Sequence, residues 1–372
     1  MRPLLNDLRA QIDAADEELA ALLQKRLKLV ARAQALKDSN RTQLYDRQRE
    51  EAVMRHCQEL SSRYGLPAGL LSDLLRRMLR ESYLCSPGSC PASISSPRPL
   101  VIVGGRGAMG RLFVRLFRAA AYRVVVVDRD DMHDIARLTE DALAVMISVP
   151  IDCTVEVITQ VARHLSADTV LCDLTSVKLP AMQAMLACHS GPVVGLHPMF
   201  GPDTPNLIKQ VVVSVAGRGD EHCEFLLEQL RLFGARVVPC TAAEHDLAMS
   251  VIQALRHFTT YYYGVFLCHI NPSLEQIVAL SSPIYRLELE MVVRLFTQDP
   301  HLYAQIIMSS RDNLRLIRMY RDQLQREIEV IENGDEQTFV ERFNEVRRFF
   351  GDFAAMFIKE SQNLLAKLQD ER

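Results

Sequence analysis

One glycine-rich turn, set between two β-branched runs, constrains the fold of this chain more than any other feature. The run 100–103 is followed by Gly105, Gly107 and Gly110, at the spacing Gly-x-Gly-x-x-Gly. An amphipathic stretch comes next, and a second run, 124–127, consists of valines. Together these segments predict a strand, a tight turn, a helix and another strand, which is the unit that binds dinucleotides.

Each glycine of this turn has its own physical role. Gly105 permits the tight turn, Gly107 lets the backbone approach a pyrophosphate, and Gly110 lets the helix pack closely against the strand. The helix N-terminus, at Ala108 and Met109, supplies free N–H groups and a partial positive charge for the phosphates.

Asp128 ends the valine run, at the distance from the glycines where a carboxylate binds both ribose hydroxyls. We therefore expect NAD as the cofactor, in preference to NADP. Arg129 follows directly and softens that preference, because its positive charge suits a 2′-phosphate.

Length and composition describe a globular protein of two or three domains. The 372 residues are 48% hydrophobic and 24% charged, and a net charge of −3 gives no reason to expect nucleic acid as a partner. Nine scattered cysteines without a Cys-x-x-Cys pair predict reduced thiols, with no disulfide framework and no metal site. No apolar signal core or membrane-spanning run occurs, so we expect a cytoplasmic protein with no membrane partner.

Residues 1–84 are predicted to form an all-α domain with helices over 4–38, 46–62 and 68–84. The first helix would be ~50 Å long, and its two shorter neighbours cannot cover its apolar stripe within one subunit. We therefore expect this domain to dimerise by intertwining. The serine- and proline-rich segment 85–99 has the composition of a linker.

The remainder of the chain is predicted to form two further domains. From 100 to 241 strands alternate with helices, which predicts an α/β Rossmann-type domain with a doubly wound parallel sheet. The expected strands are 100–104, 123–128, 143–149, 169–173, 192–196, 211–215 and 235–239. From 242 to 372 only helical patterns remain, and we expect this all-α domain to close the substrate cleft and to form a dimer. Its expected helices are 243–268, 274–298, 301–332 and 335–369.

Charged residues gather on one face of the first long helix. Arg26 and Lys37 are eleven residues apart, so about three full turns separate them and they share a face. Arg9 is seventeen residues before Arg26, ~25 Å along the same helix, so only an antiparallel partner could bring it to the same site.

The second helix begins with a similar grouping. Asp46, Arg49 and Glu50 lie at i, i+3 and i+4, and therefore share a face. An ordinary solvated face on a helical dimerisation arm would also explain these charges.

Two segments that follow predicted strands carry the other candidate residues, DLTSVK at 173–178 and GLHPMFGP at 195–202. Such loops line the ligand crevice of a doubly wound fold, which places Ser176, Lys178 and His197 near the nicotinamide. A histidine flanked by glycine and proline in such a loop is a better candidate for proton transfer than a lone core histidine.

The N-terminal domain resembles the chorismate mutase domain of the AroQ class. The run LRAQIDAADEELAALLQKRLKLV, then Lys37, then YDRQREE carry the resemblance. It implies an all-α intertwined dimer in which Arg9 of one subunit enters the partner's site. Arg26 and Arg49 would bind the carboxylates of chorismate, and Lys37 would donate to its ether oxygen.

The same resemblance gives weaker members of this site. Glu50 and Asp46 would bind the ring hydroxyl or orient the arginines, and Ser82 on the third helix would contribute less. The family often has a glutamine one turn after the serine as a second donor, whereas this chain has Ser86 there, in the predicted linker.

The segments DLTSVK, GLHPMFGP and SSPIYRLELEMVVRLFTQDP resemble prephenate dehydrogenase. The resemblance implies that His197 accepts the proton of the 4-hydroxyl of prephenate while Ser176 orients it. It also implies that Arg294 binds a substrate carboxylate, with Arg286 and Lys178 as secondary candidates for the remaining negative charge.

Together the two resemblances cover the chain apart from 85–99, and imply a mutase fused ahead of a dehydrogenase. Chorismate would be rearranged to prephenate, which NAD-dependent oxidative decarboxylation would convert to 4-hydroxyphenylpyruvate, for tyrosine biosynthesis. Tyrosine, which resembles that product, would be a feedback inhibitor. His257 and His245, in EHDLAMSVIQALRHF, would line the cleft or respond to the inhibitor, although an ordinary core or surface histidine also fits each of them.

Two alternatives remain open from the sequence. Dehydrogenases of the β-hydroxyacid and 6-phosphogluconate type share a dinucleotide domain followed by helices, but they lack the His-Pro-x-Phe-Gly-Pro loop. An NAD-sensing regulator that dimerises or binds nucleic acid through its N-terminal helices is the second. Neither alternative predicts turnover of chorismate.

Overall fold

A computed structural model describes residues 2–39, 46–67, 69–84 and 90–370 of this chain. Its contacts divide it into two compact units, Met1–Ala243 and Glu244–Arg372. Among the described residues, no helix is both long enough and apolar enough to cross a membrane.

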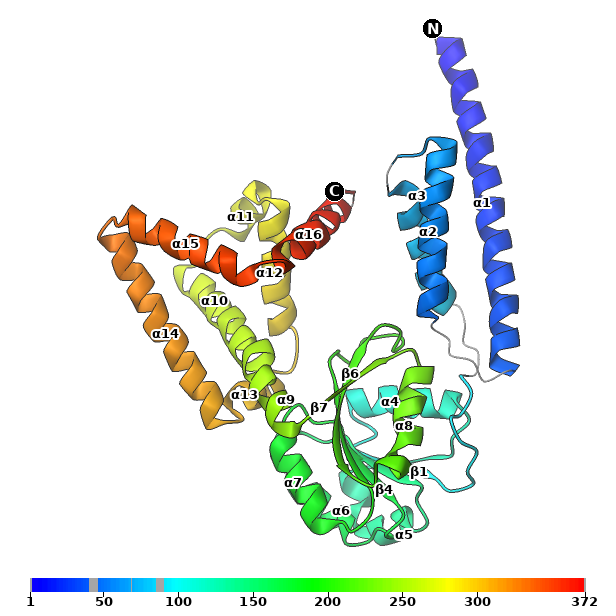
Figure 1. The fold of residues 1–372 in the computed structure, drawn as a ribbon, viewed down its shortest axis with the longest axis vertical. Coiled ribbons are helices and arrows are strands. Elements are labelled where there is room, and N and C mark those ends of the chain that lie inside the picture. The colour runs from blue at the N-terminus through cyan, green and yellow to red at the C-terminus, as the bar shows by residue number, and fades with distance from the viewer. Residues whose placement is uncertain (1, 40–45, 68, 85–89, 371–372) are drawn as a thin grey trace. The chain divides into compact units, whose positions relative to one another are not determined.

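Three helices form the N-terminal part of the first unit, as predicted (Figure 1). They are α1 (Arg2–Ser39), α2 (Arg47–Tyr64) and α3 (Leu70–Leu84). Asp46 caps α2 by accepting a hydrogen bond from the Arg49 N–H at 2.9 Å, and Gly65 ends it in the left-handed conformation.

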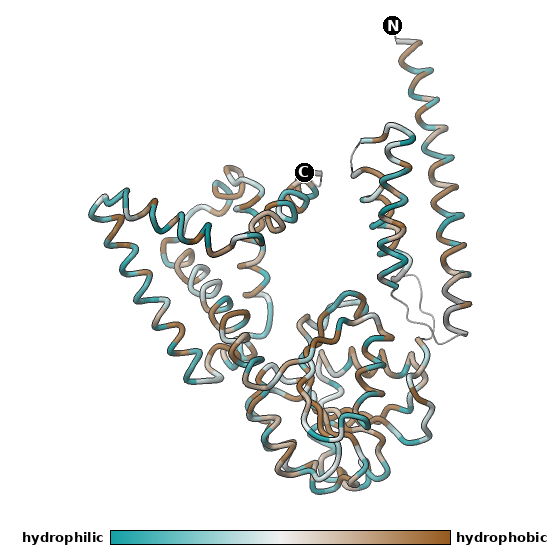
Figure 2. The backbone as a smooth tube through the Cα atoms, viewed as in Figure 1, coloured by the Kyte–Doolittle hydropathy of each residue, from teal (hydrophilic) through white to brown (hydrophobic). Residues whose placement is uncertain are grey.

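The long helix α1 leaves much of its apolar surface uncovered. Figure 2 shows apolar residues recurring along its whole length. The large apolar side chains exposed on α1 are Leu4, Leu5, Leu8, Ile12, Leu19, Leu22, Leu29 and Leu36. Large apolar side chains are therefore exposed along most of the described length of α1.

A seven-stranded sheet forms the centre of the first unit, in the order β2-β1-β3-β4-β5-β6-β7. The strands are β1 (Leu100–Val103), β2 (Val124–Val127), β3 (Ala144–Ile147), β4 (Val170–Asp173), β5 (Val193–Pro198), β6 (Val211–Arg218) and β7 (Arg236–Cys240). All seven lie where the sequence predicts a strand. The sheet is parallel, as predicted, except at one pair of strands, because β6 runs antiparallel to β5. The segment 199–210 that joins these two strands contains no helix to carry the chain back across the sheet.

Helices cover both faces of the sheet, as expected of a doubly wound fold. One core packs alternate residues such as Leu100 and Ile102 against α4 (Ala108–Ala119) and α8 (Asp220–Leu232). The other core packs the intervening residues, such as Val101 and Val103. It lies against α5 (Ile135–Thr139), α6 (Ile151–Ala162) and α7 (Lys178–Cys188). The central strands are therefore buried on both faces.

The second part of the predicted linker packs into this unit. Gln229 of α8 is fully buried, and its Oε1 accepts hydrogen bonds from Ser93 N at 2.7 Å and from the Tyr122 hydroxyl at 3.0 Å. Its Nε2 donates to the carbonyl oxygen of Pro91 at 3.3 Å. Residues 90–99 are thus bound to the sheet domain, and residues 85–89 lie outside the described part of the chain.

The second unit is helical, and its helices are shorter than predicted. They are α10 (Arg256–Ile270), α11 (Leu274–Leu280), α12 (Pro283–Phe296), α13 (Pro300–Met308), α14 (Arg311–Glu332), α15 (Glu336–Phe350) and α16 (Phe353–Asp370). Each of the three long helices predicted after residue 273 is interrupted once. Ser282 and Ser310 cap new helices with their side chains, and Gly351 has a positive φ that ends α15.

The segment that enters this unit contains a π-helical turn. Helix α9 (Ala242–Met249) continues through the π-helical residues Ser250–Leu255 into α10. The sequence predicts one regular helix here, but the wider π-turn changes the direction in which later side chains point.

Candidate active sites

The glycine turn after β1 is tightly packed, although the residue with a positive φ is Gly104 rather than Gly105, to which the sequence assigned the turn. A Cβ atom at Gly110 would lie 2.7 Å from the Cα of Gly105 and nearer still to the carbonyl oxygen of Gly104. Gly107 is the N-cap of α4 and has no side chain to cover the first N–H groups, those of Ala108 and Met109. Because the N-cap residue is a glycine and has no Cβ atom, this helix N-terminus stays accessible to a phosphate.

Asp128 is held by the backbone around it. Its carboxylate accepts hydrogen bonds from Arg106 N at 3.1 Å and from Arg129 N at 3.0 Å. Its own N–H donates to Asp131 at 3.0 Å, and Asp131 also binds the Arg106 guanidinium at 2.9 Å. A fixed carboxylate beside a glycine cradle fits the ribose and pyrophosphate of NAD.

His197 and Ser176 lie near the carboxyl ends of two neighbouring strands. His197 is on β5, is 4% exposed, and pairs in register with Val213 of β6. Ser176 follows β4, and its buried Oγ has no hydrogen-bond partner among the described residues; the same is true of Thr175 Oγ1. Buried hydroxyls without a partner are expected where a ligand supplies one.

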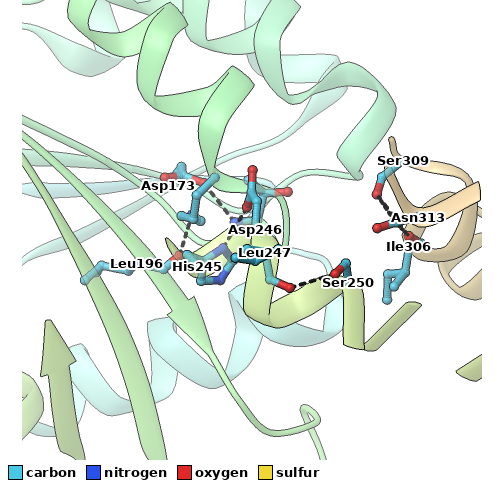
Figure 3. Close-up of polar contacts among 11 residues, drawn as sticks. Asp173, Leu196, His245, Asp246, Leu247, Ser250, Ile306, Ser309 and Asn313 are labelled. Atoms are coloured by element: carbon cyan, nitrogen blue, oxygen red, sulfur yellow. Dashed lines mark hydrogen bonds and ion pairs between the residues drawn. The ribbon is translucent and has the colours of Figure 1, made fainter. Parts of the chain in front are cut away.

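Lys178 has a different environment from the one predicted. It begins α7 and is fully buried, so its ammonium cannot act as an open binding site for substrate. Nζ lies 2.5 Å from Asp173 Oδ2 and 2.7 Å from the carbonyl oxygen of Leu196 (Figure 3). The predicted role of this lysine as a direct substrate ligand is therefore not supported.

Within the second unit, Arg294 belongs to a cluster that also contains a residue missed by the sequence analysis, Arg256. The Tyr303 ring packs edge-on against His257, with 4.8 Å between ring centroids. Burial raises the pKa of the Tyr303 hydroxyl, and the nearby charges of Arg256 and Arg294 oppose that rise. Burial, aided by Arg256, lowers the pKa of His257 to about 4, so this histidine is neutral at pH 7.

This cluster adjoins a largely apolar cavity of about 690 Å³, which Tyr303, Phe258 and Leu295 help to line.

Arg286 is engaged elsewhere, since its Nε donates to Glu290 one turn along the exposed surface of α12, at 3.3 Å. His245 is buried on α9, where its Nδ1 lies 2.7 Å from Asp246 Oδ1. Figure 3 shows the Ser250 hydroxyl bound to the Leu247 carbonyl, and Asn313 bound to Ile306 and Ser309.

The N-terminal helices bring a second group of charges together. Arg26 Nη1 and Glu50 Oε2 are buried and have no hydrogen-bond partner among the described residues, while the other Glu50 oxygen is paired with Lys209. Burial raises the pKa of Cys57, and the guanidinium groups of Arg26 and Arg76 oppose the rise. A buried guanidinium nitrogen without a partner suits an anionic ligand.

The other predicted members of this group are placed as follows. Ser82 is buried on α3, and its hydroxyl donates to the carbonyl of Met78 at 2.8 Å. Arg49 and Arg9 are exposed, and Arg9 lies near the far end of α1. Lys37 is on α1, but its side chain lies outside the described part of the chain, as does Ser86.

Neither region shows, among the described residues, a group of three histidine, cysteine or acidic side chains that could hold a metal ion. The fold and the glycine turn define the class of protein: a Rossmann-type dinucleotide-binding protein with a separate all-α domain ahead of it. Family models identify the three parts as chorismate mutase type II (residues 8–85), the nucleotide-binding domain of prephenate dehydrogenase (116–238) and its dimerization domain (241–345).

Full-length relatives name the family. The chain is 47% identical to the T-protein of Enterobacter agglomerans, over 99% of both chains, and 42% identical to that of Haemophilus influenzae, over 98% of this chain and 97% of the relative. It belongs to the T-protein family. A solved prephenate dehydrogenase from Aquifex aeolicus, with hydroxyphenyl propionate and NAD+, has the same fold, with a TM-score of 0.57 and 19% identity over 71% of this chain and 99% of that one.

These findings confirm the predicted fold class and the predicted family. They also decide against the two alternatives, because the resemblance extends through both the N-terminal helical domain and the dehydrogenase domains.

Proposed function

We propose that this chain catalyses two consecutive steps of tyrosine biosynthesis. Its N-terminal domain rearranges chorismate to prephenate, and its later domains convert prephenate to 4-hydroxyphenylpyruvate by NAD-dependent oxidative decarboxylation. The observation that carries this proposal is the similarity to two T-proteins, at 47% and 42% identity, over nearly the full length of the chain. We further propose the domain division 1–84, 100–241 and 242–372, with the intervening 85–99 bound to the sheet domain from residue 90 onward.

The rearrangement of chorismate needs no nucleophile and no proton transfer. The protein must hold a dianion in its reactive conformation and stabilise negative charge on the breaking ether oxygen. Arg26, with its buried unpaired nitrogen, and Arg49 bind the carboxylates, while Lys37 donates to the ether oxygen. Glu50, whose Oε2 is buried and has no partner among the described residues, receives the ring hydroxyl.

Asp46, Ser82 and Arg9 complete the proposed mutase site in supporting roles. Asp46 fixes the start of α2, and therefore the position of Arg49, by capping the helix. Ser82 lies on α3, which packs against both other helices. Arg9 is exposed and far along α1 from Arg26, so it serves the site of a partner subunit.

The dehydrogenase step uses the residues at the carboxyl ends of β4 and β5. NAD, when bound at the glycine turn and Asp128, supplies the acceptor for the hydride from C4 of prephenate. His197 takes the proton of the 4-hydroxyl as the carbonyl forms. Ser176, whose Oγ has no partner among the described residues, bonds to the His197 ring and orients it once the substrate is bound. Loss of carbon dioxide then makes the ring aromatic, which makes the step irreversible.

Arg294 binds a carboxylate of prephenate in this proposal. Its position near Tyr303, together with Arg256, gives that part of the helical unit two positive charges beside an apolar cavity. Such a site suits an anion with a six-membered ring. Arg286 contributes less, because Glu290 neutralises it.

Tyrosine would inhibit the dehydrogenase by occupying the same cleft as the product that it resembles. His257 is the better candidate for this response, since it is neutral and packed against Tyr303 near the cavity. His245 is buried and bound to Asp246, which favours a structural role.

We also propose that the protein works as a homodimer in the cytoplasm. Exposed apolar residues along α1 require a partner helix, and the family model of the last domain describes dimerization. The helices α15 and α16 likewise expose large apolar side chains: Phe343, Val346, Phe349, Phe353, Phe357 and Ile358.

The purified chain should be given chorismate with NAD, and separately prephenate with NAD, while NADH and 4-hydroxyphenylpyruvate are followed. We expect NADH from both substrates. NADH from prephenate alone would reduce the first 84 residues to a dimerisation or regulatory arm. Absence of NADH from either substrate would refute the proposed function.

A further inference from the structure

We propose that the buried ion pair of Lys178 and Asp173 is a positioning device for His197. The pair fixes the peptide bond that joins Leu196 to His197, so the rate of prephenate oxidation depends on a lysine that does not touch the substrate. This inference rests on the proposed dehydrogenase function and assigns a further residue to it.

The hydrogen-bond ladder between β4 and β5 ends just before Leu196 and His197. Strand β4 pairs with β5 only as far as Asp173, which is opposite Gly195. On β5 the carbonyl of Pro192 accepts a hydrogen bond from Leu171 N at 2.9 Å, and carbonyls alternate in direction along a strand. The carbonyl of Leu196 therefore faces β4 at a point where that strand has ended.

Lys178 supplies the missing donor. If the ladder continued, the N–H of Thr175 would reach Leu196, but it donates instead to Asp173 Oδ2 at 3.0 Å. The ammonium of Lys178 bonds to Leu196 O at 2.7 Å and to the same Asp173 oxygen at 2.5 Å. On its other side β5 is held by β6, so the backbone at His197 is fixed from both edges.

The sequence around these residues is shaped to admit the lysine. Both charged side chains are fully buried. A Cβ atom at Gly195 would lie 2.7 Å from Met182 Sδ and 3.2 Å from Lys178 Cδ, so the first glycine of GLHPMFGP leaves room for the lysine stem. A buried pair adds little net stability compared with apolar residues of equal volume. The pair binds the carbonyl of Leu196, one peptide bond away from the proposed base His197. This position indicates that the pair fixes where His197 lies, rather than adding stability.

The test uses Lys178→Met and the double variant Asp173→Asn/Lys178→Met in the full chain. The double variant carries no uncompensated buried charge, and the Asn oxygen still accepts from Thr175 N. We expect kcat for prephenate oxidation to fall about 100-fold in both, the effect of a displacement of about 1 Å. The KM values for prephenate and NAD should change less than threefold, and chorismate mutase activity should be unchanged.

Arg98→Met is the matched control. Arg98 also binds carboxylates and backbone carbonyls: its guanidinium contacts Asp168 at 2.7 Å and Asp141 at 3.1 Å, and it donates to the carbonyl oxygens of Ala142 and Asp141. It lies before β1 begins, at the amino ends of the parallel strands, away from His197. This variant should keep kcat within twofold of the parent chain.

A second comparison separates positioning from general damage. In a His197→Ala background, Lys178→Met should lower the residual kcat no further, because the lysine acts through the histidine. An equal loss in both backgrounds, or a kcat within twofold of the parent in both Lys178 variants, would overturn the inference. So would failure of both variants to fold, since the pair would then be a folding element. If the parent chain itself does not oxidise prephenate, the proposed function fails and the inference with it.

Discussion

Replacing Gly110 with alanine tests whether the glycine turn is a cofactor cradle that tolerates no added atom. The new Cβ would lie 2.7 Å from the Cα of Gly105, whereas ordinary contacts begin at 3.4 Å. Helix α4 must therefore retreat by at least about 0.7 Å, because the atoms that it meets belong to the backbone and cannot rotate away. The first N–H groups of the helix move with it.

A retreat of this size should be costly for the dehydrogenase and neutral for the mutase. Overpacking costs about 1–3 kcal/mol of unfolding free energy, and a displaced phosphate site should lower kcat/KM for NAD roughly 10- to 100-fold. The assay follows NADH from prephenate across NAD concentrations, with chorismate consumption by the same sample as the measure of intact protein. Gly107→Ala is the comparison for stability, since its Cβ would meet only Gly104 O, at 3.1 Å, and the loss of unfolding free energy should be smaller than in Gly110→Ala. Normal NAD kinetics in Gly110→Ala would refute the reasoning.

Three further outcomes are expected. Arg26→Ala should lower mutase kcat/KM by about 10²–10³ and spare the dehydrogenase, and His197→Asn should lower the dehydrogenase by about 10²–10⁴ and spare the mutase; loss of both activities in one folded variant would contradict two separate sites. Asp131→Asn should free Arg106 for a 2′-phosphate and raise the ratio of kcat/KM for NADP over NAD about tenfold, a ratio that an uninvolved carboxylate would leave unchanged. Because the pKa of His257 is about 4 in the fold and 6.5 in the unfolded chain, only the unfolded chain gains a proton there as the pH falls from 6.5 toward 4, so stability is lost over that window; His257→Gln should show a smaller drop in Tm between pH 7 and pH 5, and equal drops would refute the shift.

Local pattern was enough to place the strands and the glycine turn. Runs such as Val124–Val127 are short, β-branched and bounded by polar residues, so periodicity and composition agree. Composition and periodicity do not show whether a strand runs parallel or antiparallel to its neighbour. The reversal at β6 depends on the absence of a helix in 199–210, a stretch that contains two prolines and a glycine and was open to that interpretation.

The role of a side chain is harder to predict from sequence where that role depends on burial. A lysine on a loop after a strand suggests a substrate ligand, and only the three-dimensional structure shows that Lys178 points into the core. Arg256 is far from Arg294 in sequence, and Tyr303 lies on the helix that follows that of Arg294, so only the packing of three helices brings them together. The helix breaks at Ser282 and Ser310 had a local signal, since serine is a preferred N-cap, but apolar periodicity continued across both.

The docking of residues 90–99 onto Gln229 bears on how two enzymes can share one polypeptide. A freestanding dehydrogenase released from this chain at Leu100 would lose Ser93 and Pro91 as partners of the fully buried Gln229 amide, and the gap would expose Tyr122. Release before Cys90 would keep that seal complete. A fusion of this kind can therefore be separated into two enzymes only by a cut before Cys90, several residues ahead of the first strand of the dehydrogenase.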